Sequence, residues 1–103
     1  MNKRIDFLDL VKDGFFKGDI DCKKFLNEQL RYYEQKDIEN GGQHAVIFKA
    51  LYMEETQTFD ALAKRFYINV YTLDRYRQRY SKFAIKLATP ELIAKYDPTK
   101  AVR

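Results

Sequence analysis

Apolar side chains recur at intervals of three and four residues along almost the whole chain, and this spacing restricts the possible folds most. It places apolar groups on one side of an α-helix, whereas a half-buried strand alternates every second residue. No stretch shows convincing alternation. The 103 residues include only 4 Gly and 2 Pro, so the chain has few breaks. The sequence therefore predicts an all-α fold: one domain, residues 1–103, folded as a helical bundle of five to six helices.

Capping residues and turn residues divide the chain into helices. Gly18 ends the first helix, Asp19 or Asp21 caps the second, and Asn40-Gly41-Gly42 is the clearest break. The expected helices cover residues 3–17, 21–38, 43–54, 59–66 and 70–88, followed by a short one that opens at Thr89-Pro90-Glu91 and stops at Asp97-Pro98. Residues 1–40 thus form an N-terminal helical pair, residues 43–88 a three-helix unit, and residues 89–103 a short helix with a frayed tail.

The same spacing predicts which side of each helix faces the core. In the helical pair the expected core residues are Ile5, Leu8, Val11, Phe15, Cys22, Phe25, Leu26, Gln29, Leu30 and Tyr33. In the three-helix unit they are Val46, Ile47, Ala50, Leu51, Phe59, Leu62, Ala63, Phe66, Leu73, Tyr76, Tyr80, Phe83, Ala84 and Leu87. The many aromatic residues are therefore expected in the core rather than on a base-stacking surface. His44, close to a helix start, is expected at the surface.

The counts of reactive residues exclude several kinds of site. Cys22 is the only cysteine and His44 the only histidine, so neither an intramolecular disulfide nor an ordinary Cys/His zinc site can form. Ser81 is the only serine, and nothing around it resembles a nucleophile turn. A glycine-rich phosphate loop is also missing. We therefore expect no enzymatic activity, no metal and no cofactor.

Charge is distributed unevenly along the chain. The formal net charge is +4, but residues 58–103 carry ten bases and four acids, and residues 1–57 carry nine bases and eleven acids. A basic half joined to a mildly acidic half is expected when one face meets a polyanion, although a solvated lysine-rich surface gives the same count.

The sequence also bears on location. No apolar run approaches the roughly 18 residues that a membrane span needs. Asp6, Asp9 and Asp13 interrupt any apolar core of a signal peptide. We expect a cytoplasmic protein with no membrane contact.

Residues 58–77 carry the pattern of a helix-turn-helix. Ala63 is small enough to let the second helix cross closely, Ile68 is the apolar plug of the turn, and Asn69 caps the second helix. Tyr67 departs from the pattern, because it stands where glycine is usual and where φ is commonly positive. Helical hairpins of plain bundles share parts of this spacing, so a purely structural hairpin is the alternative.

From His44 to Ala88 the chain resembles the region-four DNA-binding domain of sigma factors, and still more the small phage regulators of the ArpU and RinA type. In those families a similar helix leads into a helix-turn-helix whose second helix carries an Arg-Tyr-Arg-like stretch and an apolar end. Residues 74–80 and 83–87 match these two features. The resemblance covers under half of the chain. It implies a transcriptional regulator of a phage or mobile element, and RNA polymerase as a further partner that could hold such a module as a monomer.

The helix-turn-helix also predicts which side chains meet DNA. The second helix of such a motif lies in the major groove, with its first residues at base edges. The expected base-reading residues are Tyr71, Thr72, Arg75 and Gln78, and the expected phosphate contacts are Thr58, Lys64, Arg77, Arg79 and Lys82. Asp74 would repel phosphate unless it pairs with Arg77 or Gln78 or accepts a hydrogen bond from a cytosine.

These observations predict a sequence-specific binder of double-stranded DNA. A DNA-binding accessory protein of conjugation, excision or packaging would use the same domain, and a helical protein-interaction adaptor without DNA binding is the alternative of another class. We also expect a homodimer, because one helix-turn-helix contacts few base pairs and residues 1–40 carry large apolar stripes. Those stripes could instead close the core of the monomer.

Overall fold

The computed structural model describes residues 6–55 and 57–101. Its helices are α1 (Phe7–Phe16), α2 (Ile20–Asn40), α3 (His44–Tyr52), α4 (Phe59–Arg65), α5 (Val70–Leu87), α6 (Pro90–Lys95) and α7 (Pro98–Ala101). No strand occurs among the described residues. The prediction of an all-α bundle of five to six helices is confirmed: six helices have six residues or more, and α7 is one further helical turn.

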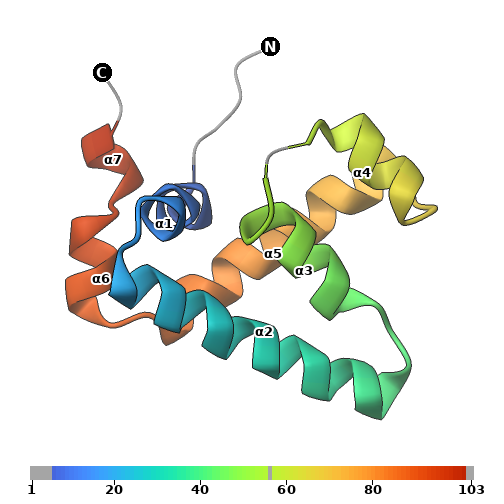
Figure 1. Ribbon diagram of the computed structural model, residues 1–103, viewed down its shortest axis with the longest axis horizontal. Coiled ribbons are helices and arrows are strands. Elements are labelled where there is room, and N and C mark those ends of the chain that lie inside the picture. Colours follow the sequence, from blue (N-terminus) through green and yellow to red (C-terminus); the bar gives the residue numbers. More distant parts are fainter. Residues whose placement is uncertain (1–5, 56, 102–103) are drawn as a thin grey trace.

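The two longest helices, α2 and α5, form the frame of the bundle. Helix α3 packs on α2 and α5, and α1 packs on α2, α3 and α5. Helix α4 packs on α5 at one end of the molecule, while α6 and α7 lie at the other end beside α1 (Figure 1). This arrangement leaves one side of α5 without a covering helix.

Side-chain caps fix where most of the helices begin. Asp6 and Asp9 form a capping box at the start of α1, with both N–H···O distances at 3.0 Å. The predicted caps Thr58, Asn69 and Thr89 each accept a backbone N–H at the start of α4, α5 and α6. Each such cap typically stabilises a protein by about 1 kcal/mol.

Helix α3 is capped from a distance. Its own N-cap residue, Gln43, makes no side-chain cap hydrogen bond. The Asp37 carboxylate of α2 instead accepts from the backbone N–H groups of His44 and Ala45, at 3.0 and 2.7 Å. Because an anion at a helix N-terminus is favourable, Asp37 holds the corner between α2 and α3.

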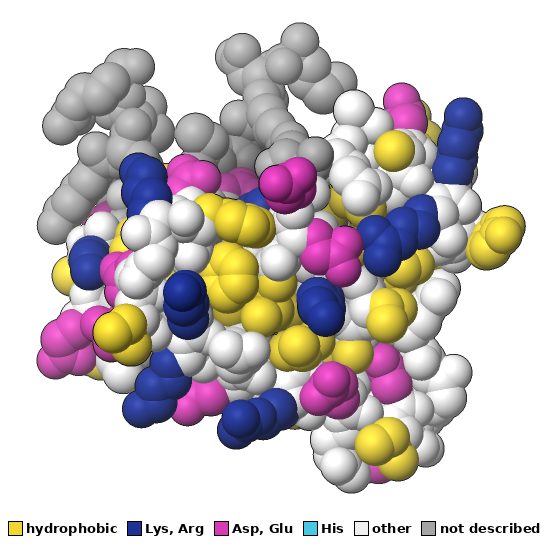
Figure 2. Space-filling view, viewed as in Figure 1, with side chains coloured by type: hydrophobic (Ala, Val, Ile, Leu, Met, Phe, Trp, Pro, Cys, Tyr) yellow, Lys and Arg dark blue, Asp and Glu magenta, His cyan; other side chains and the backbone are white. Residues whose placement is uncertain are grey.

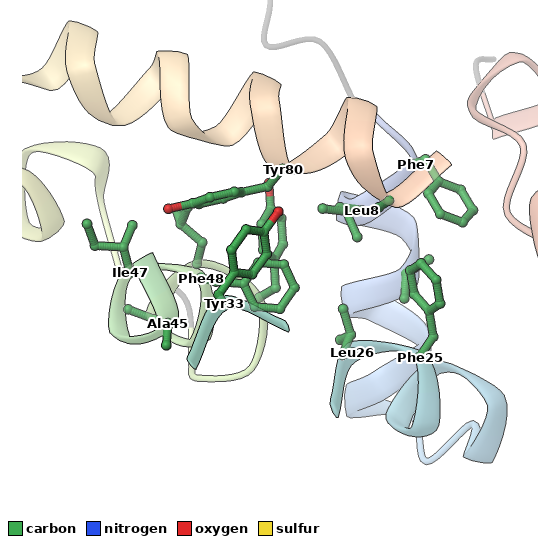
Figure 3. Close-up of a cluster of buried hydrophobic side chains, with 14 of the residues drawn as sticks. Phe7, Leu8, Phe25, Leu26, Tyr33, Ala45, Ile47, Phe48 and Tyr80 are labelled. Atoms are coloured by element: carbon green, nitrogen blue, oxygen red, sulfur yellow. The ribbon is translucent and has the colours of Figure 1, made fainter. Parts of the chain in front are cut away.

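The core has two adjoining groups of side chains (Figure 3). Phe7 and Leu8 of α1 lie against Phe25 and Leu26 of α2, and the Phe7 and Phe25 rings are 6.0 Å apart. In the second group the Tyr33 ring lies 5.2 Å from that of Phe48 and 4.8 Å from that of Tyr80. These rings join α2, α3 and α5, and their burial confirms that the aromatic residues serve mainly as core.

The N-terminal stripes close the monomer's own core. Leu8 and Val11 of α1, and Cys22, Phe25 and Leu26 of α2, are all buried within the single chain. Gly14 allows the close approach, because a Cβ at this position would lie 2.5 Å from the Cys22 sulfur. The stripes therefore give no specific support for the predicted homodimer.

Some predictions about individual core residues were wrong. Val46 and Leu87 are 50% and 54% exposed. Helix α3 buries its other sides, including Ala45 and Tyr52, so its short apolar series did not single out one face. Leu87 is the last residue of α5, where the chain turns toward α6.

Three further predictions concern the surface, the tail and the first residues. His44 was expected at the surface, but it is half-buried and its Nδ1 lies 2.7 Å from the Tyr80 hydroxyl. The predicted frayed tail begins with α7 instead. Ile5 lies outside the described residues.

Candidate nucleic-acid interface

Helices α4 and α5 are joined by a tight turn. Phe66 is the C-cap of α4, and the next residue, Tyr67, is left-handed with φ of +57°. The Tyr67 N–H donates to the Lys64 carbonyl at 3.2 Å, and the Ile68 N–H donates to the Ala63 carbonyl at 2.9 Å. This pair of hydrogen bonds is the Schellman motif that commonly ends a helix. The sequence allowed either a variant turn or a strained Tyr67, and the positive φ of Tyr67 shows the second.

Buried apolar contacts hold α4 and α5 against each other. Leu62, Ala63 and Phe66 of the first helix and Leu73 of the second are buried, and Ile68 packs against the same core. The Gln43 side chain donates to the Phe66 carbonyl at 3.3 Å, which ties the start of α3 to the turn. These contacts join α3, α4 and α5 within the core that α1 and α2 also share.

One face of α5 is buried and the opposite face is open. Leu73, Tyr80, Ser81 and Ala84 are buried. The exposed face carries, along the length of the helix, Tyr71, Arg75, Gln78, Arg79, Lys82 and Lys86. Since these residues run from position 71 to position 86 at about 1.5 Å per residue, the exposed face is about 22 Å long. We call Arg75, Arg79, Lys82 and Lys86 the basic row. With Gln78 and Phe83, they line a shallow open hollow of about 440 Å³.

The single acid of α5, Asp74, is hydrogen-bonded to neighbouring side chains of the same helix, and it shares the cation Arg77 with Asp6. The Asp74 carboxylate accepts from the Arg77 guanidinium at 3.1 and 3.2 Å and from the Gln78 amide at 2.8 Å. No residue of the basic row makes an ion pair within the described part of the chain. The open face of α5 is therefore uniformly positive.

Arg77 requires a correction. It was expected to contact phosphate, but its side chain is only 16% exposed and lies on the inner side of α5. The guanidinium donates to the Asp6 carboxylate at 2.6 Å, which connects α5 to the start of α1. Burial raises the pKa of the Asp6 carboxyl, as does the adjacent Asp9, and the charge of Arg77 opposes this shift. Arg77 is therefore part of the tertiary structure and is not available to a phosphate.

The remaining predicted contacts fall into different environments. Tyr71 is 80% exposed at the start of α5, while Thr72 is only half-exposed. Lys64 is exposed on α4. Thr58, near which backbone N–H groups were expected to hold a phosphate, is exposed at the start of α4, and its hydroxyl caps that helix. The structure thus brings Tyr71, Gln78 and most of the predicted cations onto one face, with Thr72 at its edge.

Sequence reasoning did not select Lys86 or Tyr67. Lys86 continues the basic row, and its positions four after Lys82 and seven after Arg79 are the signal that could have identified it. Tyr67 is 95% exposed, and it was noticed only for its backbone.

The side of the molecule formed by α1, α2 and α3 carries both signs of charge (Figure 2). Figure 2 shows the side on which α1, α2 and α3 lie in front, where acidic and basic side chains are interspersed around hydrophobic ones. This mixture contrasts with the basic row, which has cations alone.

Among the described residues, no group of three or more His, Cys, Asp or Glu side chains is placed to hold a metal ion. Within the same residues, no helix is both long enough and apolar enough to cross a membrane. The sequence matches no protein-family model, and no curated protein or solved structure shows significant similarity to it.

Proposed function

We propose that this protein binds double-stranded DNA by placing α5 in the major groove. The observation that supports this most is the basic row on the uncovered face of α5, the second helix of a tight helix-turn-helix. The major groove is wide enough for an α-helix, and a helix-turn-helix presents its second helix there. An unpaired row of cations supplies the attraction to phosphate.

Residues at the start of α5 would reach base edges. Arg75 is the strongest candidate, because its guanidinium is exposed and can bond bidentately to the O6 and N7 atoms of guanine. Tyr71 precedes it by one helical turn. Gln78 would have to leave the Asp74 carboxylate, at 2.8 Å in the free protein, before its amide could bind adenine.

Residues farther along α5 would bind phosphates. Arg79, Lys82 and Lys86 extend from the middle to the end of the helix, where it would pass the edge of the groove. Lys64 on α4 is a fourth candidate. Each phosphate that a cation neutralises contributes about 0.9 to the slope of log affinity against log salt.

The biological role rests on the resemblance to sigma region four and to phage regulators. We therefore propose a cytoplasmic transcriptional regulator of a phage or mobile element, with RNA polymerase as a further partner. An accessory role in conjugation, excision or packaging would use the same DNA-binding surface. The homodimer stays a prediction, and sedimentation equilibrium at micromolar concentration tests it against the monomer mass of 12.3 kDa.

Selection of bound duplexes from a random pool, followed by affinity measurements at several salt concentrations, tests this function. We expect an enriched sequence and an affinity that falls steeply with salt. The matched control is a scrambled duplex of the same composition, which should bind more weakly. Failure to bind any duplex would contradict the proposal and favour the helical adaptor.

A further inference from the structure

Tyr67 occupies a backbone conformation that costs free energy for any residue with a side chain. Three described residues have positive φ, and the other two, Gly18 and Gly41, are glycines. Gly18 ends α1 with the same two hydrogen bonds that end α4: its N–H donates to Phe15 and the next N–H donates to Gly14. The chain thus has glycine in one copy of this motif and tyrosine in the other.

The Tyr67 side chain makes no contact among the described residues that would offset this strain. It is 95% exposed, and it makes no hydrogen bond or ring contact with any described residue. Glycine would form the same turn without steric conflict. A strained residue that contributes nothing to packing is typical of a functional position.

The place of Tyr67 in the fold indicates what it meets. It precedes Asn69, the cap of α5, by two residues, so it lies at the end of α5 that the proposed function brings to DNA. It lies outside the helix, whereas base edges deep in the groove are reached by side chains that project from the helix itself. A phenol at the edge of the groove faces the sugar–phosphate backbone, and tyrosine hydroxyls are common donors to phosphate.

We infer that Tyr67 contacts the DNA backbone, with its ring against a deoxyribose and its hydroxyl donating to a phosphate next to the start of α5. This inference rests on the proposed function. It adds a contact that contributes affinity but carries no sequence information, and it explains why a bulky residue stands at a glycine position.

Three substitutions separate the ring from the strain. Tyr67→Gly removes both, so we expect the Tm to rise by about 4 °C. We expect its affinity to fall about five- to tenfold, equally on the selected and the scrambled duplex. Tyr67→Ala removes the ring but keeps the strained backbone, so its affinity should fall likewise without the gain in Tm. Gly18→Ala is the matched control for strain. It should lower the Tm through backbone strain alone, because no atom lies within 4 Å of the added Cβ. It should leave DNA affinity unchanged.

The salt dependence provides a further test. A neutral hydroxyl releases no counterion, so the Tyr67→Gly variant should keep the wild-type salt slope. Unchanged affinity in this variant would overturn the inference while leaving the proposed function intact. A loss confined to the selected duplex would overturn the backbone assignment, and a Tm that does not rise would overturn the argument from strain. Wild-type protein that binds no duplex would overturn the proposed function itself.

Discussion

Arg77 and Arg79 stand two residues apart on α5, and we expect their substitutions to have opposite effects. The Arg77 guanidinium lies 2.6 Å from the Asp6 carboxylate, and the two side chains are 16% and 18% exposed. Arg77→Met leaves Asp6 without its cation in a mostly buried place. Removing one partner of a fully buried pair costs about 3–5 kcal/mol, whereas exposed pairs contribute under about 1 kcal/mol. For this partly buried pair we expect a loss of about 2–3 kcal/mol in the free energy of unfolding.

Thermal and urea unfolding measure this loss, and DNA affinity is measured in parallel at a temperature where both variants are folded. A loss of 2–3 kcal/mol should lower the Tm by about 8 °C or more in a chain of this size. Arg79→Met is the matched control, since Arg79 is exposed and forms no ion pair with any residue that the structure describes. It should keep the Tm within about 2 °C and reduce the salt slope by about 0.9.

The Asp6 carboxylate provides a second measurement. Burial already raises its pKa, and removal of the Arg77 charge should raise it further. Protonation then relieves the unpaired charge in the variant, so the stability difference between wild type and Arg77→Met should shrink as pH falls toward 4. Normal stability together with weakened DNA binding in this variant would refute the structural role and restore Arg77 as a phosphate contact.

Other expectations follow from close contacts, pH and the basic row. Gly14→Ala should lower the free energy of unfolding, measured in urea, by about 1–2 kcal/mol, because its Cβ would lie 2.5 Å from the Cys22 sulfur and from the Tyr96 hydroxyl. This loss should exceed the gain from the better helix propensity of alanine, and equal stability would contradict the close packing of α1. Hydrogen bonds from Lys95 and Tyr96 hold the pKa of Asp19 well below its ordinary 3.8, so its stabilisation is present above pH 4 and is lost in acid. The Tm difference between wild type and Asp19→Asn should therefore be largest near neutral pH and shrink below pH 4, and a constant difference would exclude this linkage. Arg75→Ala should cost about 1–3 kcal/mol on the selected duplex and relax one base preference. Lys86→Ala should weaken all duplexes alike, and a sequence-dependent loss would contradict its assignment to phosphate.

Local signals in the sequence predicted the parts of the fold that depend on neighbouring residues. The caps Thr58 and Asn69 lie within three residues of the N–H groups that they accept, so the start of both helices was predictable from sequence alone. The conformation of Tyr67 was not, because the sequence allowed either a variant turn or a positive φ at this residue.

The errors concern features that depend on distant residues. Asp6 lies 71 residues before Arg77, so no local pattern links them, and an arginine in a basic stretch was taken for a phosphate contact. Helix α3 is buried on several sides and its cap, Asp37, lies in the preceding helix. Periodicity identifies one buried face, and it therefore placed Val46 in the core although other helices cover the remaining sides of α3.

The ion pairs show that part of the uneven charge of the sequence is used inside the fold. Three of them join an acid before residue 57 to a base after it: Asp6 with Arg77, Glu54 with Arg65, and Asp19 with Lys95. Part of the charge asymmetry thus holds the two halves of the chain together, as it would in any folded protein. Net charge alone would count these bases as attraction for a polyanion, yet their partners already neutralise them. The basic row is different, because no carboxylate of the described residues pairs with it and every member lies on the same face of α5. These cations of α5, rather than the net charge of the chain, therefore support the proposed binding of DNA.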